Sequence, residues 1–220
     1  MITVESKYSN ASIGNDIKIL QEIHLKTKNI AIYQRQMELS EKEVAQAVKQ
    51  TIDFRANGKK EEITASLCNY FANVIPKQNA LLEDILDLFE LFIQVTKISS
   101  FRIILASVDD NMCPRFHTDN NQLRMLCTYV GPGTLWLPDC AVDRKAYMSG
   151  KRNQDIVLDE SFIQQVETGN VAILKGGLYP ESTPLLHRSP LIEKRKEKRL
   201  LLRIDSNEFL NLNNDTVNNT

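Results

Sequence analysis

Two histidines and an aspartate provide the first chemistry that the sequence suggests. His117 and Asp119 stand two residues apart in CPRFHTDN, and His187 follows much later in LLHRSP. In an extended strand, side chains at i and i+2 leave the same face, so this imidazole and this carboxylate can reach one metal ion. Two imidazoles and one carboxylate form the facial triad that leaves three coordination positions open on a non-haem iron. The three residues are therefore a candidate metal site.

Cysteines offer a second way to complete such a site. Cys113 stands four residues before His117, so a mixed zinc site with Cys, His and Asp ligands is an open alternative. A catalytic Cys-His pair is less favoured, because no oxyanion turn or third member is evident. The four cysteines show no CxxC spacing, and the chain begins without a secretory signal, so we expect reduced thiols and a cytoplasmic protein. His24 stands in no motif, and we expect it to be structural.

Short apolar runs surround the candidate ligands and must position them. Their lengths, and the turns between them, are typical of the strands of a small barrel or sandwich. The runs are FRIILASV at 101–108, LRMLCTYV at 123–130, WL at 136–137, VAIL at 171–174 and RLLLRID at 199–205, with a Gly-rich turn at 131–134.

Roughly residues 101–205 resemble the core of the iron(II)- and 2-oxoglutarate-dependent oxygenases in the order of their elements. That order is a strand, His-x-Asp, a strand, a Gly-rich turn, a strand, a histidine and a strand with an arginine. The blocks CPRFHTDN, RMLCTYVGPGTLWLPD and LLHRSP also look like those of a bacterial family of unknown function. The resemblance implies a double-stranded β-helix, a cupin-like jelly-roll barrel, with Fe(II) and 2-oxoglutarate as cofactors. It implies His117, Asp119 and His187 as metal ligands. One departure is Gly169-Asn170, where the family usually has Gly-Asp.

The same resemblance implies an arginine for the far carboxylate of 2-oxoglutarate. It places this residue about a dozen positions after the distal histidine, which selects Arg199, with Arg203 in reserve. Alternation puts both arginines on one face of the last strand with Leu201, and an inward arginine there needs a counter-anion. Tyr129 is a candidate for hydrogen bonding to the cofactor, or is simply an aromatic residue in a sheet.

Four further residues near the ligands have two interpretations each. Arg115 and Arg124 contact substrate or Asp119, or form surface salt bridges. Asn120 orients Asp119 as a hydrogen-bond donor, or turns the chain. Arg188, beside His187, likewise serves either the site or the local chain.

The first hundred residues carry mainly helical patterns, which we expect to pack on a barrel of residues 101–205 in an α+β fold. A capping box at Ser40 and Glu43 predicts a helix that continues past Ile52 and ends before Gly58. The remaining expected elements are a short helix or an amphipathic turn at 16–25, a strand at 29–35, a helix at 60–74, a helix at 80–97 capped by Asn79, a polar insertion at 143–160, a charged hairpin loop at 193–199 and a disordered tail at 206–220.

Charge and composition exclude little else. A formal net charge of −1 and a pI near 6.3 give no electrostatic reason to expect nucleic acid or an anionic membrane as a partner. No apolar run is long enough to span a bilayer. The oligomeric state stays open.

Three functions are compatible with the sequence. The first is an iron(II)- and 2-oxoglutarate-dependent oxygenase whose substrate is unknown. The second is a non-catalytic protein that binds zinc or iron in metal homeostasis or sensing. The third is a β-barrel interaction module with structural histidines.

Overall fold

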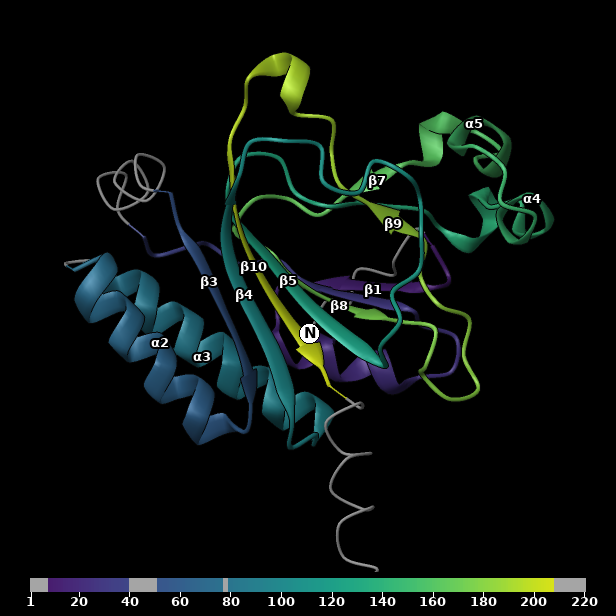
Figure 1. The fold of residues 1–220 in the computed structure, drawn as a ribbon. Coiled ribbons are helices and arrows are strands. Elements are labelled where there is room, and N and C mark those ends of the chain that lie inside the picture. The colour runs from purple at the N-terminus through teal and green to yellow at the C-terminus, as the bar shows by residue number, and fades with distance from the viewer. Residues whose placement is uncertain (1–7, 40–50, 77–78, 208–220) are drawn as a thin grey trace, which may run out of the picture.

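The computed structural model describes residues 8–39, 51–76 and 79–207. Its largest element is a seven-stranded sheet with the order β1-β2-β8-β5-β10-β4-β3, and a three-stranded sheet has the order β7-β6-β9 (Figure 1). The strands are β1 (Ala11–Gly14), β2 (Ile30–Tyr33), β3 (Asp53–Gly58), β4 (Phe101–Val108), β5 (Leu123–Val130), β6 (Leu135–Trp136), β7 (Gln164–Gln165), β8 (Val171–Lys175), β9 (His187–Arg188) and β10 (Arg199–Ser206).

Four α-helices and four short 3-10 helices accompany the sheets in the described residues. The two long helices follow β3, and the two short ones lie in the polar insertion after β6. The helices are α2 (Lys60–Val74), α3 (Asn79–Thr96), α4 (Arg144–Met148) and α5 (Asn153–Ile156), and the 3-10 helices are η1 (Ile17–His24), η2 (Asp139–Ala141), η3 (Glu160–Phe162) and η4 (Glu193–Arg195).

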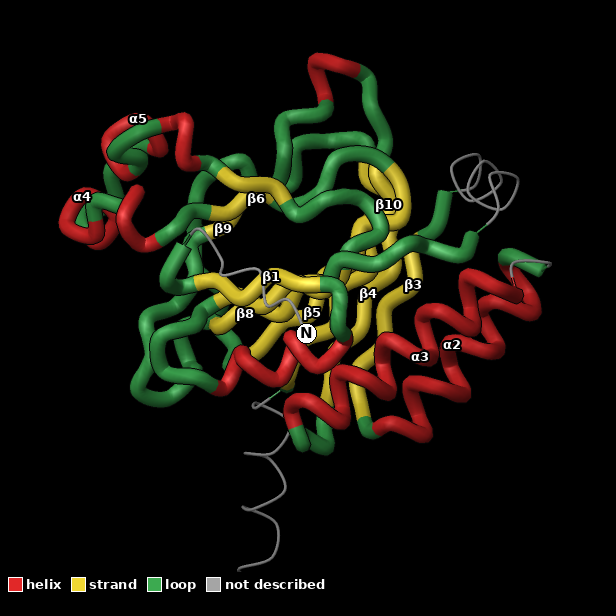
Figure 2. Tube along the Cα trace, turned by 180° about the vertical axis from the view of Figure 1, so that it is seen from behind, coloured by secondary structure: helices red, strands yellow, loops and turns green. Residues whose placement is uncertain are grey.

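Helices α2 and α3 cover one face of the large sheet (Figure 2). Their apolar stripes meet the strands in the main core, which contains Leu67 of α2, Phe89 of α3 and Phe101 of β4. The rings of Phe89 and Phe101 pack edge to face with centroids 5.1 Å apart. Burying each phenylalanine stabilises the fold by about 1.5–3 kcal/mol. The helical periods that predicted these two elements therefore reflect core packing against the sheet.

The last strand, β10, lies between β4 and β5 and pairs antiparallel with both. Leu200, Leu202 and Ile204 enter the helix-facing core, as alternation predicted. Leu201 instead enters a second core with Leu126 of β5 and Trp136 of the small sheet. This opposite side of the large sheet, called the inner face below, carries Arg199, Arg203 and Asp205.

The inner face is only partly covered. The small sheet packs over its centre through the Trp136 core. Towards the β3 edge, side chains from β3, β4 and β10 line an open groove of about 550 Å³. The polar insertion forms α4 and α5, which project beyond the small sheet (Figure 1).

The expected helix before Gly58 is wrong over its last turn and a half. Asp53–Gly58 is strand β3, which pairs antiparallel with β4 from Asp53 opposite Ala106 to Gly58 opposite Phe101. Phe54 is buried in the main core, whereas Asp53 and Arg55 are exposed. This period of two, together with the free edge of β4, favours a strand. The predicted capping box at 40–43 lies outside the described residues.

The first hundred residues supply more strand than their patterns suggested. Strands β1, β2 and β3 all join the large sheet alongside strands from the second half. The division of the chain at residue 100 stays a prediction. Most of the tail that was expected to be disordered, 208–220, also lies outside the described residues. No described helix is long and apolar enough to cross a membrane.

Candidate metal centre

His117, Asp119 and His187 lie together. One ligand atom from each residue can be chosen so that all three lie within 4.8 Å of one another. The two histidines pair as an antiparallel bridge: each backbone N–H donates to the other's carbonyl oxygen at 3.0 Å. The backbone therefore fixes the relative position of two side chains that are seventy residues apart in the sequence.

The ring of His117 is oriented by the backbone of its own segment. Its Nδ1 lies 2.9 Å from the carbonyl oxygen of Arg115, and a carbonyl can only accept a hydrogen bond. Nδ1 must therefore carry the proton, which leaves the lone pair of a neutral ring on Nε2. That nitrogen lies 3.7 Å from Oδ1 of Asp119. His117 thus presents a metal-binding nitrogen towards the other two residues.

His187 is buried, and burial lowers its pKa to about 4, although the nearby Asp119 opposes the shift. The imidazole is therefore neutral at pH 7, as a metal ligand must be. Its Nε2 lies 3.3 Å from Oδ2 of Asp119. That buried carboxylate oxygen has no hydrogen-bond partner among the described residues. A lone carboxylate oxygen facing imidazole nitrogens is a donor set that fits a divalent metal ion.

Arg124 supports this carboxylate from β5. Its Nη1 contacts Oδ1 of Asp119, while Nε and Nη2 bind the carboxylate of Asp205 on β10. Asn121 also donates to Asp205, at 3.1 Å. The interpretation of Arg124 as a contact of Asp119 is therefore the one that the structure supports. Asp205 and Asn121 were not foreseen; the alternation of β10, which places Asp205 on the inner face with Arg203, was the available signal.

Arg199 is a buried cation without an anion. It is 2% exposed, and its Nη2 lies 3.4 Å from the hydroxyl of Thr128 and 3.5 Å from that of Thr134. Its Nε has no hydrogen-bond partner among the described residues. Burial lowers its pKa to about 10. The counter-anion that an inward arginine needs is thus not supplied by the described part of the chain.

Tyr129 lies on the other face of β5. Its hydroxyl donates to Oδ2 of Asp84 on α3 at 2.6 Å, and Asp84 also forms a two-point ion pair with Arg35. Burial is the main reason that the pKa of Tyr129 is raised well above its ordinary value. The structure does not bring Tyr129 together with Arg199 or the metal ligands, and it joins the helix-facing core as an aromatic residue of the sheet.

The remaining candidates lie around the centre in different ways. Arg115 is exposed and donates to the carbonyl of Lys151 at 3.1 Å, so only its backbone serves His117. Asn120 is exposed and lines a hollow beside Arg124. Arg188 stacks over the ring of Phe116 at 5.0 Å.

Two other residues stand outside the cluster. Cys113 is exposed and does not belong to the metal-binding group found among the described residues. His24 binds the Tyr179 hydroxyl and the Val95 carbonyl with its two ring nitrogens, at 2.9 and 2.8 Å, which agrees with a structural role.

Comparison with solved structures identifies the fold. A dioxygenase for auxin oxidation from Arabidopsis thaliana, solved with 2-oxoglutarate, matches with a TM-score of 0.51 and 8% identity, over 89% of this chain and 91% of that one. A prolyl-4-hydroxylase from Pseudomonas putida matches with a TM-score of 0.45 and 10% identity, over 86% and 93% of the two chains. The chain is a mixed α/β protein with a large sheet, and the first of these matches shows that it is similar in fold to the auxin dioxygenase.

No curated protein sequence matches the chain. A family model does, over residues 14–205, and its description is "Protein of unknown function (DUF1826)". The blocks around His117 and His187 fall within that span, and so does Arg199. Since the match covers most of the sequence, the chain belongs to the DUF1826 family.

Proposed function

We propose that this protein is an iron(II)- and 2-oxoglutarate-dependent oxygenase. The observation that carries the proposal is the combination of a His-Asp-His cluster with Arg199, a buried guanidinium lacking an anionic partner in the described chain. A metal site alone fits many functions. A buried cation on the same face fits a dicarboxylate that bridges metal and arginine.

The strand β5 relates the two parts of this site. Arg124, which contacts Asp119, and Thr128, which lies against Arg199, share its inner face. Four residues of extended strand separate them by about 13 Å between Cα atoms. We infer that the small and large sheets form the two sides of a double-stranded β-helix, with this site between them.

Each residue then has a defined task. His117, Asp119 and His187 would hold iron(II), which supplies oxidation of the substrate coupled to conversion of 2-oxoglutarate and dioxygen to succinate and carbon dioxide. Arg199 donates two hydrogen bonds to the far carboxylate of 2-oxoglutarate, a geometry that suits a planar guanidinium. The hydroxyls of Thr128 and Thr134 position that guanidinium. Arg124 fixes the orientation of Asp119.

An anaerobic titration tests the proposal. Metal-free protein receives iron(II) and then 2-oxoglutarate, and a visible charge-transfer band is expected only after both additions. His117→Ala should lose the band, and the matched change His24→Ala, at the histidine outside the cluster, should keep it. Arg199→Ala should bind iron but require far more 2-oxoglutarate. Iron binding without any binding of 2-oxoglutarate would contradict the proposal.

Zinc binding without oxygenase activity remains the second candidate, because two imidazoles and a carboxylate also suit zinc. A zinc-binding function of this kind does not explain the buried Arg199, because it provides no anion for the guanidinium group. Metal analysis of untagged protein separates the two: tightly held zinc that iron cannot replace would favour metal homeostasis or sensing.

A further inference from the structure

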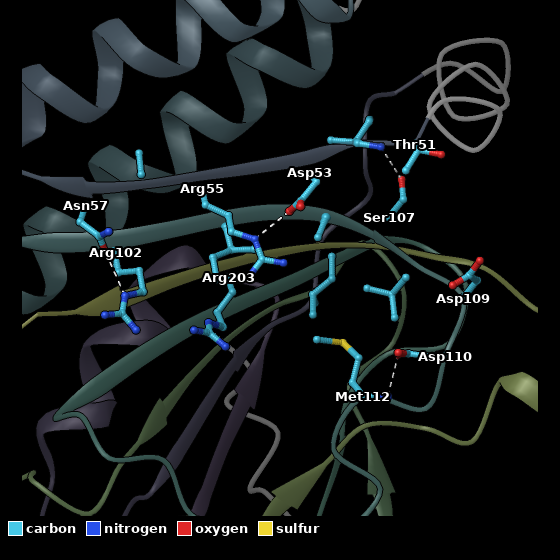
Figure 3. Close-up of a pocket in the computed structure, with 16 residues that line it drawn as sticks. Thr51, Asp53, Arg55, Asn57, Arg102, Ser107, Asp109, Asp110, Met112 and Arg203 are labelled. Atoms are coloured by element: carbon cyan, nitrogen blue, oxygen red, sulfur yellow. Dashed lines mark hydrogen bonds and ion pairs between the residues drawn. The ribbon is translucent and has the colours of Figure 1, made fainter.

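The open groove on the inner face leads towards the metal centre. It runs over β3, β4 and β10 and is lined by Arg55, Arg102 and Arg203, whose side chains lie on the same side of the sheet (Figure 3). Arg102 and Arg203 also line the hollow of about 290 Å³ that contains Asn120 and Arg124. Since Arg124 contacts the candidate ligand Asp119, this hollow lies next to the metal centre, and Arg102 and Arg203 line both the hollow and the groove.

Strand register brings three arginines together at this junction. Arg102 on β4 stands opposite Asp205 on β10, and Asp205 stands opposite Arg124 on β5. Arg203 precedes Asp205 by two residues and is therefore a diagonal neighbour of Arg102. The hollow is thus lined by three guanidinium groups and a single carboxylate, that of Asp205. Its lining carries an excess of positive charge.

Two of these arginines, Arg102 and Arg203, have N–H donors without an acceptor among the described residues. Arg124 is fully engaged by Asp119 and Asp205. Arg102 has one contact among the described residues, in which its Nε donates to Oδ1 of Asn57 at 2.9 Å. Arg203 forms an ion pair through Nε, 3.0 Å from Oδ2 of Asp205. The terminal nitrogens of Arg102 and Arg203 therefore face the hollow without acceptors from the described chain.

The charge of Arg203 is costly to hold without a ligand. Burial, and then the charge of Arg124, lower the pKa of Arg203 below its ordinary value. Neighbouring guanidinium groups that repel one another are stabilised by an oxyanion, which accepts hydrogen bonds from both. The floor next to them is apolar, formed by Ile104 and Leu201.

We propose that Arg102 and Arg203 bind an acidic group of the prime substrate, a phosphate or a carboxylate, while its apolar part lies on Ile104 and Leu201. This substrate class rests on the proposed oxygenase function. Arg199 is separate from this pair, because it contacts Thr128 and Thr134 and is assigned to the cofactor.

Phenyl phosphate, benzoate and phenol provide matched probes, since they share a ring and differ in charge. Binding to the metal-free full-length chain is measured by ligand-observed NMR at constant ionic strength, because screening by salt weakens such contacts. At least one of the two anions is expected to bind more tightly than phenol. Preference for phenyl phosphate indicates phosphate esters as substrates, and preference for benzoate indicates carboxylic acids. Equal binding of all three probes would overturn the proposal.

Variants locate the binding. Arg102→Gln and Arg203→Gln should each weaken binding of the preferred anion roughly tenfold or more, because each variant loses one charge-assisted hydrogen bond. Arg203→Lys keeps the charge and should lose less, which separates charge from folding. Arg55→Gln is the matched control, because Arg55 lies on the same face but is paired with Asp53 and does not line the hollow. Arg199→Gln should also leave binding unchanged. If the anion binds equally well to the Arg102→Gln and Arg203→Gln variants, the assignment of the anion site to these two arginines is wrong.

A further measurement tests whether the anion site serves the metal centre. With Mn²⁺ bound at the cluster, the ring protons of the bound probe should relax faster than with Zn²⁺, because only Mn²⁺ is paramagnetic. No difference in relaxation would place the anion away from the reaction and overturn its role as substrate. The anaerobic titration is independent of this result: Arg102→Gln should retain the iron and 2-oxoglutarate band. Absence of the band in the unaltered protein would instead refute the oxygenase proposal.

Discussion

Asp119 and Asp205 share one guanidinium, that of Arg124, although Asp205 is 81 residues beyond Arg124 in the chain. Strand β5 thereby joins a candidate metal ligand to the last strand of the sheet. All three side chains are largely buried. The geometry of the candidate metal centre consequently depends on correct pairing of β5 with β10.

Replacing Arg124 by Met should weaken metal binding by about 10- to 100-fold, as loss of groups that orient metal ligands does. It should also lower the free energy of unfolding of the metal-free protein by about 3–5 kcal/mol, because the buried carboxylate of Asp119 loses its arginine, while Asp205 keeps Asn121 and Arg203. Chelator competition and urea unfolding measure the two effects. The exposed Arg152→Met is the control and should change neither. Unaltered metal affinity in Arg124→Met would show that Asp119 needs no such support.

Replacing Arg199 by Met should abolish tight binding of 2-oxoglutarate and stabilise the ligand-free protein. The apolar side chain removes a buried charge that has no counter-anion in the described part of the chain, and replacing buried charges by apolar groups is neutral or stabilising by about 1–4 kcal/mol. Thermal unfolding without ligand, compared with 2-oxoglutarate titration of the iron-loaded form, separates the effects. A marked loss of ligand-free stability would mean that Arg199 is a structural residue with a partner in the folded chain.

Thr128 and Tyr129 are neighbours on opposite faces of β5 and form a matched pair. Thr128→Val should weaken 2-oxoglutarate binding, because its hydroxyl lies against Arg199, and should leave the core intact. Tyr129→Phe should lower the free energy of unfolding by about 1–2 kcal/mol, through the lost bond to Asp84, and leave cofactor binding unchanged. The two variants require the same unfolding and titration measurements. The reverse pattern would show that the inner and outer faces of β5 have been assigned the wrong way round.

The lowered pKa of the buried Lys175 predicts that the stability of the protein depends on pH. Its ammonium group is buried and donates to the carbonyl of Leu25 at 2.9 Å, and burial lowers its pKa to about 8. The unfolded lysine keeps its ordinary pKa of 10.5, so between pH 8 and 10.5 the unfolded state binds more protons. The contribution of Lys175 to stability should therefore rise with pH across this window.

The comparison with Lys175→Met isolates this contribution, because the pKa values of Cys127 and Tyr129 are raised by burial and act in the opposite direction. Urea unfolding from pH 7 to 10 should show the unaltered protein gaining stability relative to the variant as pH increases. A constant difference between the two would mean that Lys175 is not titrating in the folded state.

Local sequence patterns determined much of this protein. The helical stripes ending before Pro76, and the one beginning at Asn79, correspond to α2 and α3, because a helix face repeats every three to four residues wherever it packs. The alternation of 199–205 separated Arg199 and Arg203 from the apolar side chains, since the period of a strand is a local property. The spacing of His117 and Asp119 also selected two members of the candidate metal cluster, although the segment forms an isolated bridge at His117 and not the strand that the spacing assumed.

Other features were decided by contacts between distant segments. Asp53–Gly58 is a strand because β4 offers it a free edge, and the side chain of Tyr129 faces α3 because Asp84 and Arg35 lie there. The Gly-rich turn also has a tertiary cause: a Cβ at Gly133 would lie 1.8 Å from the carbonyl oxygen of Val166.

The sequence alone therefore determined the strands and helices with a clear period and selected the three candidate metal ligands, while the family resemblance selected Arg199, whose role stays a prediction. Only the tertiary structure decided which residues support them. It placed Arg124 between Asp119 and Asp205, buried Arg199 with no anion from the described residues, and made Arg102 and Arg203 diagonal neighbours on two strands. The physical reason is that periodicity describes one segment, whereas a shared ion pair or groove depends on which segments become neighbours.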